Sequence, residues 1–346
     1  MTEMMQRITL ARRPVGAPVN EDFKLESVAI PTPGEGEILV RVKYMSLDPY
    51  MRGRMDDAKS YAAPVPLGGT MEGGAVGKVL ASNSPHFKAG DIAFGMFGWV
   101  THGVLPAKEC RKLDPAHGPM TAALGVLGMP GFTGWYGLTE LGRPKAGETV
   151  VVAAATGPVG SMVGQIAKQR GLRAVGIAGG AKKCALAVEK FGFDACIDHY
   201  AYDDAKALRK AIAAECPKGI DIYFENVGGK VFEAVLPMMN TFGRIPVCGM
   251  ISGYNLGALG GNEATGPDRL PVLWRNILVK QMSVNGFIIS NHWDLYPAFL
   301  AEVGPLVATG KVAFVEDIAE GLENAPAAFM GMLTGKNFGK QIVKVG

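Results

Sequence analysis

The feature that most constrains the fold is a glycine-rich turn that joins an apolar run to an amphipathic helix. The run Thr149–Ala154 is apolar after its first residue, as expected of a strand buried on both faces of a parallel sheet. It leads into Ala155-x-Gly157-x-x-Gly160 and then Val159–Arg170, whose apolar side chains share one helical face. Small residues in such a turn let the backbone approach a pyrophosphate, to which the helix N-terminus presents unpaired amides. The pattern predicts a dinucleotide-binding unit; the alternative is a turn with a purely structural role.

Strand-like and helix-like segments continue to alternate after this unit. This order is typical of an α/β domain with a doubly wound parallel sheet. The further predicted strands are Leu172–Ala178, Ala195–Asp198, Asp221–Glu225 and Arg244–Cys248, and the predicted helices are Lys182–Phe191, Asp203–Ala214 and Lys230–Met238. Gln281–Phe287 is a candidate for an edge strand of the same sheet.

The chain before Met129 reads differently, as short strands between turns. Glu37–Tyr44 alternates apolar and polar residues, and Ala75–Ala81 is an apolar run that follows two pairs of glycines. This pattern favours a barrel or sandwich-like β domain. Lys311–Phe314 and Lys340–Val345 again resemble strands and are expected to rejoin that domain. The predicted division is 1–127 for the first domain, 128–292 for the nucleotide-binding domain, and 293–346 for the return to the first domain.

Composition excludes several other classes of protein. Lys and Arg number 35 against 32 Asp and Glu, a net charge of +3, and no basic run is dense enough to follow a nucleic acid backbone. The five cysteines include no Cys-x-x-Cys pair, which argues against a disulfide framework or a cysteine-rich zinc lobe. No apolar run reaches about 18 residues, and Met1–Arg13 lacks the apolar core of a leader peptide. We therefore expect a cytoplasmic protein without a nucleic acid or membrane partner.

The end of the second predicted strand indicates which dinucleotide binds. An NAD site places Asp or Glu there to hold the ribose hydroxyls, whereas this chain has Gly179-Gly180-Ala181-Lys182-Lys183. Without a carboxylate, a 2′-phosphate meets no repulsion, and one or both lysines can pair with it. Positive side chains at a helix N-terminus are otherwise unfavourable, so an anionic partner explains them better than a solvated helix start. The pattern favours NADP over NAD.

These residues and several longer motifs resemble the zinc-independent medium-chain dehydrogenases/reductases. Within them the chain is most similar to the branch of prostaglandin reductases, alkenal double-bond reductases and curcumin reductases. The motifs that carry the resemblance are Leu47–Gly53, Met129–Thr133, Ala154–Gly160, Glu225–Gly229, Cys248–Asn255 and Asn337–Val345. The resemblance implies a GroES-like β-rich substrate domain made from both chain ends, with a Rossmann nucleotide-binding domain between them. It also implies a homodimer, often joined through edge strands of the nucleotide domain.

The activity implied by the resemblance is NADPH-dependent reduction of the carbon–carbon double bond in α,β-unsaturated ketones or aldehydes. Hydride goes to the β-carbon, and a tyrosine hydroxyl stabilises the enolate. Two alternatives stay open: an NADPH quinone reductase on the same scaffold, and a non-catalytic NADPH-binding protein. The motifs Leu47–Arg52 and Met250–Asn255 favour the enone reductase over the quinone reductase.

The residues expected to contact the cofactor lie in these motifs or at predicted strand ends. They are Met129, Thr133, Ala155, Gly157, Pro158, Val159, Gly160, Gly179, Lys183, His199, Asn226, Cys248, Gly249, Ile251, Phe287, Asn337 and Gly339. Relatives often have tyrosine where this chain has His199. Either His199 or Tyr200 is therefore expected to contact the 2′-phosphate, alongside Lys182 or Lys183, and His199 is the preferred candidate.

Two tyrosines inside the motifs are candidates for catalysis. Tyr254, after the fifth predicted strand, is expected at the carboxyl edge of the sheet as the donor to the enolate oxygen. The alternative is that it only covers the nicotinamide or forms a structural hydrogen bond. Tyr50 is expected to line the substrate pocket, with core packing as its alternative. Arg52 is expected to be structural, paired with Asp48 or with a backbone carbonyl.

Two further features have less specific patterns. The aromatic residues Phe94, Phe97 and Trp99 either line an apolar substrate cleft or belong to the core. Ser252–Gly266 is rich in glycine and is a candidate for a mobile loop near a site.

The ligands of a catalytic zinc site are missing from the sequence. Zinc-dependent relatives use a cysteine and a Gly-His-Glu stretch at places where this chain has Ser46 and Thr70-Met71-Glu72. The histidines His86, His102, His117 and His292 are scattered singly. Too few ligands remain for a catalytic zinc, so we expect no metal.

Overall fold

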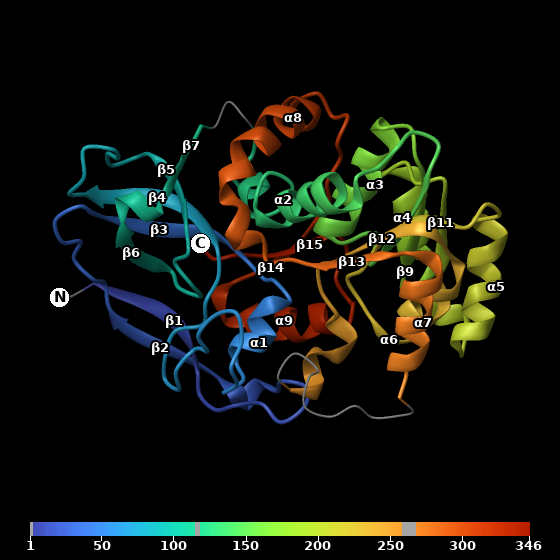
Figure 1. Ribbon diagram of the computed structural model, residues 1–346. Helices are drawn as coiled ribbons and strands as arrows, with labels where there is room; N and C mark the ends of the chain where they lie inside the picture. The colour runs from blue at the N-terminus through green and yellow to red at the C-terminus, as the bar shows by residue number, and fades with distance from the viewer. Residues whose placement is uncertain (1–2, 115–117, 258–267) are drawn as a thin grey trace. The chain divides into compact units, whose positions relative to one another are not determined.

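The computed structural model describes residues 3–114, 118–257 and 268–346, and the chain forms two compact units (Figure 1). Unit 1 contains residues 1–128, 255–258 and 316–346, and unit 2 contains residues 129–254 and 259–315. None of the helices in the described ranges is long and apolar enough to span a bilayer. Each unit is built around its own sheet.

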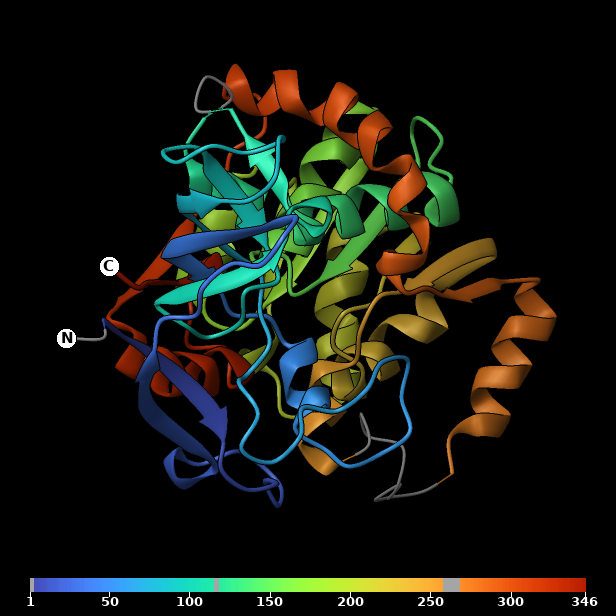
Figure 2. The ribbon, with the colours of Figure 1, turned by 90° about the vertical axis from the view of Figure 1, so that its left-hand side faces the viewer.

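Unit 1 is the β-rich unit. Six strands of its main sheet follow the order β14-β15-β3-β4-β5-β7, β6 pairs with β3, and β1 and β2 form a separate antiparallel pair. Because β15 pairs antiparallel with β3, the C-terminal red ribbon lies beside the N-terminal blue ribbon in Figure 2. The elements are β1 (Met4–Leu10), β2 (Phe23–Ala29), β3 (Glu37–Ser46), α1 (Tyr50–Arg54), β4 (Ala75–Ser82), β5 (Ile92–Gly95), β6 (His102–Pro106), β7 (Arg111–Leu113), β14 (Glu316–Glu320), α9 (Ala325–Leu333) and β15 (Lys340–Lys344).

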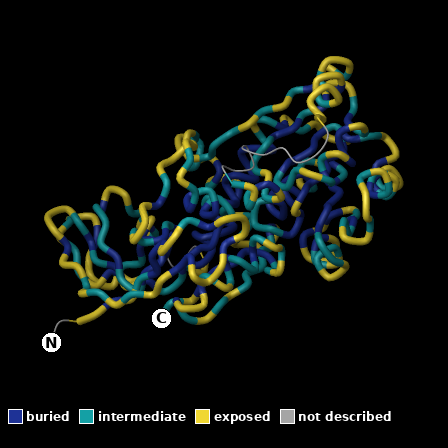
Figure 3. Tube along the Cα trace, turned by 90° about the horizontal axis from the view of Figure 1, so that it is seen from below, coloured by how far each residue is buried: buried dark blue, intermediate teal, exposed yellow. Residues whose placement is uncertain are grey.

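Unit 2 contains the predicted parallel sheet. Its strand order is β10-β9-β8-β11-β12-β13, the 3-2-1-4-5-6 order of dinucleotide-binding Rossmann sheets, so the predicted doubly wound sheet is confirmed. Every residue of β8 is buried, and Figure 3 shows buried stretches running through the interior. The strands are β8 (Thr149–Ala153), β9 (Arg173–Ala178), β10 (Ala195–Asp198), β11 (Ile220–Phe224), β12 (Met239–Val247) and β13 (Ser283–Gly286). The helices are α2 (Met129–Tyr136), α3 (Pro158–Gln169), α4 (Ala181–Glu189), α5 (Ala205–Glu215), α6 (Gly229–Val235), α7 (Leu270–Lys280) and α8 (Tyr296–Ala308).

The C-terminal part of the chain differs from the sequence prediction. No strand forms at Lys311–Phe314, where the amide of Val312 donates to the carbonyl of Leu306 at the end of α8; the strand there is β14. Residues 293–315, expected in the first domain, belong to unit 2. The reason is the apolar face of α8, because Phe299 packs on the ring of Phe132 in α2.

Candidate active site

The turn after β8 brings the start of α3 close to the strand. Gly160 has the least room, since a Cβ atom there would lie 2.3 Å from the carbonyl oxygen of Ala154. Ala154 has a positive φ of 52°, and Ala155 is fully buried where the motif usually has its first glycine. Alanine is therefore accommodated at 155, whereas only glycine fits at 160.

The first turn of α3 has the properties of an anion site. Gly157 is the N-cap residue in an extended conformation, and Pro158 occupies N1, where its missing amide costs nothing. The amides of Val159 and Gly160 follow in the first turn, in which a helix offers its N–H groups no carbonyl partner. The first turn of α3 lies wholly within the residues that the structure describes, and it contains no acidic residue. The diphosphate of a dinucleotide fits this end of the helix dipole.

The ends of β9 and β10 form a corner. The carboxylate of Asp198 accepts hydrogen bonds from the amides of Gly180 at 2.8 Å and Tyr200 at 2.9 Å, so it is committed to the turn. The Tyr200 ring lies against Gly179, because a Cβ atom on Gly179 would be 2.5 Å from ring carbon Cε2. An aromatic ring thus faces bare backbone at the position where the adenosine ribose of a dinucleotide is recognised.

Positive side chains gather around His199 in this corner. Lys230 Nζ donates to the carbonyl oxygens of His199 at 2.9 Å and Tyr202 at 2.5 Å. Burial lowers the pKa of His199, and the charges of Lys230 and Lys183 lower it further, against the opposing effect of Asp198. The positive side chains of Lys183 and Lys230 beside His199 suit the binding of a phosphate dianion. Sequence reasoning missed Lys230, although it directly follows one of the motifs.

The turn after β11 is held by Glu225. Its Oε1 atom accepts the amides of Val227 at 2.6 Å and Gly228 at 2.8 Å, and burial raises the pKa of the carboxyl group. The side chain of Asn226 donates from Nδ2 to the carbonyl of Ala153 at 2.7 Å. The ends of β11 and β8 are thereby joined at the sheet edge where dinucleotides bind.

The turn after β12 carries Tyr254 on the short helix Ile251–Leu256. The amides of Cys248 and Gly249 both donate to the backbone carbonyl of Glu225. The Tyr254 hydroxyl lies against Gly249, since a Cβ atom there would be 2.9 Å from Oη. Desolvation raises the pKa of the Cys248 thiol to about 12, which makes it a poor nucleophile. Tyr254 therefore lies at the carboxyl edge of the sheet, as its position in the sequence predicts.

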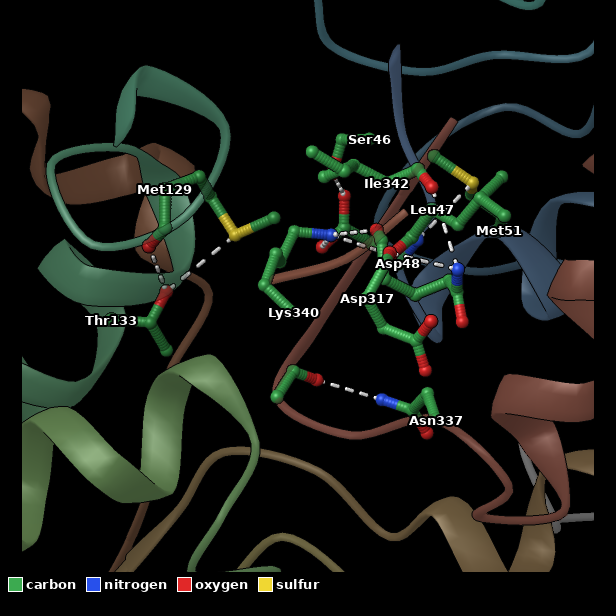
Figure 4. A network of polar contacts seen from close by, with 12 residues as sticks. Ser46, Leu47, Asp48, Met51, Met129, Thr133, Asp317, Asn337, Lys340 and Ile342 are labelled. Atoms are coloured by element: carbon green, nitrogen blue, oxygen red, sulfur yellow. Dashed lines mark hydrogen bonds and ion pairs between the residues drawn. The ribbon is translucent and has the colours of Figure 1, made fainter. Parts of the chain in front are cut away.

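Helix α2 and the segment after β13 bring together several predicted residues. The Thr133 hydroxyl donates to the carbonyl of Met129 at 2.7 Å and lies 3.6 Å from its sulfur (Figure 4). The ring centroid of Phe287 is 5.4 Å from that of Tyr136. The Tyr136 hydroxyl lies 3.1 Å from His292 Nε2, and the two rings stack. The polar groups of Thr133 and His292 thus already have partners within unit 2.

In unit 1, Tyr50 opens α1. Burial raises the pKa of its phenol well above the ordinary value, and the charges of Asp48 and Glu72 add to that effect. The Arg54 guanidinium lies 5.6 Å from the Tyr50 ring centroid and 4.5 Å from that of Tyr61, and it is 3.3 Å from the Glu72 carboxylate. The hydroxyl of Tyr50 therefore stays protonated and is able to donate a hydrogen bond. Sequence reasoning missed Arg54 and Tyr61.

The turn before β15 contains the two C-terminal candidates. Asn337 Nδ2 donates to the carbonyl of Gly339 at 2.8 Å, and the amide of Phe338 donates to Asp317 Oδ2 at 2.9 Å (Figure 4). Gly339 has a positive φ of 78°. The Asn337 amide group is thus engaged in holding its own turn.

Arg52 makes one of the two alternative contacts expected of it. Its buried guanidinium donates to the carbonyl of Gly16 at 2.9 Å and pairs with Asp56 at 2.5 Å. Of the two predicted alternatives, the structure shows the backbone carbonyl, and the guanidinium forms its ion pair with Asp56, four residues along, and not with Asp48.

The aromatic residues of the first domain mostly belong to its core. Trp99 is fully buried, stacks on Phe23 at a centroid distance of 5.7 Å and meets Phe329 edge-on. Phe97 is buried as well, while Arg111 lies over the ring of Phe94. The predicted loop Ser252–Gly266 is a short helix over residues 252–256, and residues 258–266 lie outside the described part of the chain.

Comparison with known proteins identifies the family. One family model, described as the N-terminal domain of oxidoreductase, matches residues 6–113, and another, described as zinc-binding dehydrogenase, matches residues 158–304. The chain is 52% identical to the NADPH-dependent curcumin reductase of Escherichia coli (strain K12), over 98% of this chain and 96% of that protein. The chain belongs to the zinc-independent medium-chain dehydrogenases/reductases.

Two more relatives support the same branch of the medium-chain dehydrogenases/reductases. The 2-alkenal reductase (NADP(+)-dependent) of Nicotiana tabacum is 41% identical over 98% of this chain and 97% of that protein. The crystal structure of CurA in complex with NADPH from Vibrio vulnificus is 49% identical, with a TM-score of 0.92 and 99% coverage of both chains. The predicted family and the predicted GroES-like plus Rossmann fold class are confirmed.

The places of the zinc ligands in metal-dependent medium-chain dehydrogenases/reductases have other contacts here. The Ser46 hydroxyl donates to Asp48, and Glu72 pairs with Arg54. Throughout residues 3–114, 118–257 and 268–346, no group of three or more His, Cys, Asp or Glu side chains is arranged to hold a metal ion.

Proposed function

We propose that this protein reduces the carbon–carbon double bond of α,β-unsaturated ketones and aldehydes with NADPH. The observation that carries the proposal is similarity along nearly the whole chain to a curcumin reductase and a 2-alkenal reductase, at 52% and 41% identity. Both relatives are named as NADPH- or NADP-dependent reductases, and this chain is an NADPH-dependent oxidoreductase of the same family.

Unit 2 provides the residues for the nucleotide. The amides at the start of α3 suit the diphosphate, and the corner that contains Lys183, His199 and Tyr200 suits the 2′-phosphate, with Lys230 beside them. The carboxylate at the end of β10, Asp198, accepts hydrogen bonds from two backbone amides. A 2′-phosphate would therefore lie near the cations of Lys183 and Lys230, while the Asp198 carboxylate is already hydrogen-bonded to the backbone. This arrangement favours NADPH over NADH.

Two tyrosines are the candidates for the hydrogen-bond donor to the substrate carbonyl. Bound NADPH supplies the hydride that adds to the β-carbon of the substrate. Tyr254 donates a hydrogen bond to the carbonyl oxygen as negative charge develops there. In unit 1, the phenol of Tyr50 stays protonated, so its hydroxyl is the alternative candidate for this hydrogen bond. A proton from water then adds to the α-carbon of the enolate and completes the saturated product.

The edge of the sheet in unit 2 supports a homodimer. β13 is the last strand of the sheet, and an edge strand offers its backbone groups to another chain. Exposed apolar side chains accompany it, with Trp274 63%, Leu278 78% and Val284 38% exposed. We propose that two copies pair edge to edge through β13 and α7 about a twofold axis.

The cysteines support a cytoplasmic location. All five are free thiols, and the reducing cytoplasm keeps thiols in that state. We propose that the protein acts there on small unsaturated carbonyl compounds.

The deciding experiment follows the absorbance of the reduced nicotinamide with benzylideneacetone, in parallel with NADPH and NADH. We expect NADPH-selective turnover to the saturated ketone, identified by mass spectrometry. Turnover of menadione but not of the enone would replace the proposal by a quinone reductase. Tight NADPH binding without turnover of either compound would indicate a non-catalytic binding protein.

A further inference from the structure

Lys340 is a charged side chain buried inside unit 1. Its side chain is only 4% exposed, and it begins β15 directly after the turn at Asn337–Gly339. Burial lowers the pKa of Lys340, while the carboxylates of Asp48 and Glu316 favour its charged form. A buried ammonium group is costly unless its N–H bonds find acceptors.

The ammonium group of Lys340 has an acceptor for each hydrogen. Nζ donates to the carbonyl oxygens of Leu47 at 2.6 Å and Gln341 at 2.9 Å, and lies 3.3 Å from Asp48 Oδ1 (Figure 4). An ammonium group has three hydrogens, so the set is complete. Gly125 leaves room for the stem, since a Cβ atom there would lie 3.3 Å from Lys340 Cγ. The side chain thereby joins the end of β3 to β15.

Asp48 connects this contact to Tyr50. The second carboxylate oxygen of Asp48 accepts a hydrogen bond from the Ser46 hydroxyl. Its backbone carbonyl accepts the amide of Met51 at 3.1 Å, which closes the turn that carries Tyr50. The Asp48 charge acts directly on the Tyr50 phenol. Lys340 therefore contacts the carboxylate two residues before Tyr50 and the backbone carbonyl three residues before it.

We propose that Lys340 is a positioning residue, which fixes Asp48 and the Leu47 carbonyl and thereby sets where Tyr50 presents its hydroxyl to the substrate. The inference rests on the proposed function, in which Tyr50 is a candidate donor to the substrate carbonyl. Lys340 acts through Asp48 and does not itself contact the substrate. If Lys340 only stabilised the sheet, its replacement would not lower kcat beyond any loss of NADPH binding.

The test compares Lys340→Met with Lys344→Met, because Lys344 lies at the other end of β15, is 46% exposed and pairs with Glu320. Lys340→Met should lower kcat for benzylideneacetone by about 10- to 100-fold, with the Kd for NADPH changed less than about threefold. Lys344→Met should change neither quantity. Adding Asp48→Asn to Lys340→Met should restore part of the lost kcat, because the unpaired buried carboxylate is then removed.

Three kinetic outcomes would overturn the inference. The first is a loss of kcat in Lys340→Met that is no larger than its loss of NADPH binding. The second is an equal loss of kcat in Lys344→Met. The third is a kcat in the double variant that is lower still than in Lys340→Met. If Lys340→Met does not fold, Asp48→Asn alone decides, since it removes the ion pair and leaves both carbonyl contacts of Lys340. A lowered kcat with unchanged NADPH binding then supports the inference, and an unchanged kcat contradicts it.

A spectroscopic arm separates this inference from the proposed function. In protein labelled with carbon-13 tyrosine, the Tyr50 signal is assigned by its loss in Tyr50→Phe. That signal should shift in Lys340→Met or Asp48→Asn and stay in place in Lys344→Met. This result supports the positioning role even if the wild-type protein does not reduce enones, and an unshifted signal overturns it whatever the activity.

Discussion

Gly179 and Tyr200 are in direct contact at the end of β9, where a Cβ atom on Gly179 would lie 2.5 Å from ring carbon Cε2 of Tyr200. We predict that Gly179→Ala displaces the ring and weakens NADPH binding by about tenfold, equivalent to about 1.4 kcal/mol. Titration of NADPH fluorescence measures the change. Gly304→Ala is the control, because a Cβ atom at Gly304 meets nothing within 4 Å. Unchanged binding in Gly179→Ala would show that the nucleotide does not depend on this contact.

The two neighbouring lysines differ in their surroundings. Lys183 is half-buried and acts on His199, whereas Lys182 is exposed. Lys183→Glu should narrow the preference for NADPH over NADH by about tenfold or more, because a carboxylate then faces the 2′-phosphate. Steady-state kcat/KM with both cofactors measures the ratio, and Lys182→Glu should change it far less. Equal effects of the two variants would assign the phosphate contact to Tyr200, His199 and Lys230.

His199 makes stability depend on pH. Burial and the charge of Lys230 lower the pKa of folded His199 below the value of about 6.5 in the unfolded chain. Between these two values the unfolded state binds more protons, so the free energy of unfolding falls as the pH falls through this window. His199→Asn should remove that part of the pH dependence. Urea unfolding at about pH 7.5 and about pH 5.5 tests this, and an equal slope in both proteins would contradict it.

Tyr254 is predicted to act on the transition state rather than on cofactor binding. Tyr254→Phe should lower kcat for enones by about 10²- to 10³-fold, as at other oxyanion sites, with NADPH affinity unchanged. Rapid mixing of the enzyme–NADPH complex with benzylideneacetone isolates the chemical step. Tyr44→Phe, in the small core of unit 1, should behave like the wild-type protein. Full activity in Tyr254→Phe would leave Tyr50 as the sole candidate donor among the predicted tyrosines.

The proposed dimer depends on the exposed face of α7. Leu278→Asp places a charge on the most exposed apolar side chain of that helix, so it should convert the dimer to a monomer in size-exclusion chromatography with light scattering. Leu67→Asp, in an exposed loop of unit 1, should leave the mass unchanged. A monomeric wild-type protein would exclude the dimer.

Local patterns predicted the nucleotide-binding unit well. The segment from Thr149 to Gly160 could be predicted from the sequence, because a buried strand, a turn of small residues and an amphipathic helix each have a characteristic local pattern. The position of Tyr254 followed from the rule that ligands bind at the carboxyl ends of parallel strands. These predictions depend only on neighbouring residues and on strand order.

Contacts between distant segments were not predictable in this way. Lys230 reaches the corner of His199 from α6, and Lys340 reaches Asp48 across 292 residues of sequence. Arg52 found Asp56 instead of Asp48 because the choice depends on the rotamers of buried side chains. The segment 293–315 was misassigned since its place is decided by the packing of Phe299 on Phe132, which no periodicity encodes.

The contacts among Lys340, Asp48 and Ser46 also affect whether this scaffold could be converted into a zinc-dependent enzyme. Ser46→Cys and Met71→His would introduce two ligand types of the metal-dependent enzymes, yet they would leave the ammonium group of Lys340 beside Asp48, the partner of residue 46. A divalent ion placed there would be repelled by that neighbouring positive charge. A version of this site built to hold zinc would therefore also require the replacement of Lys340 by an uncharged residue.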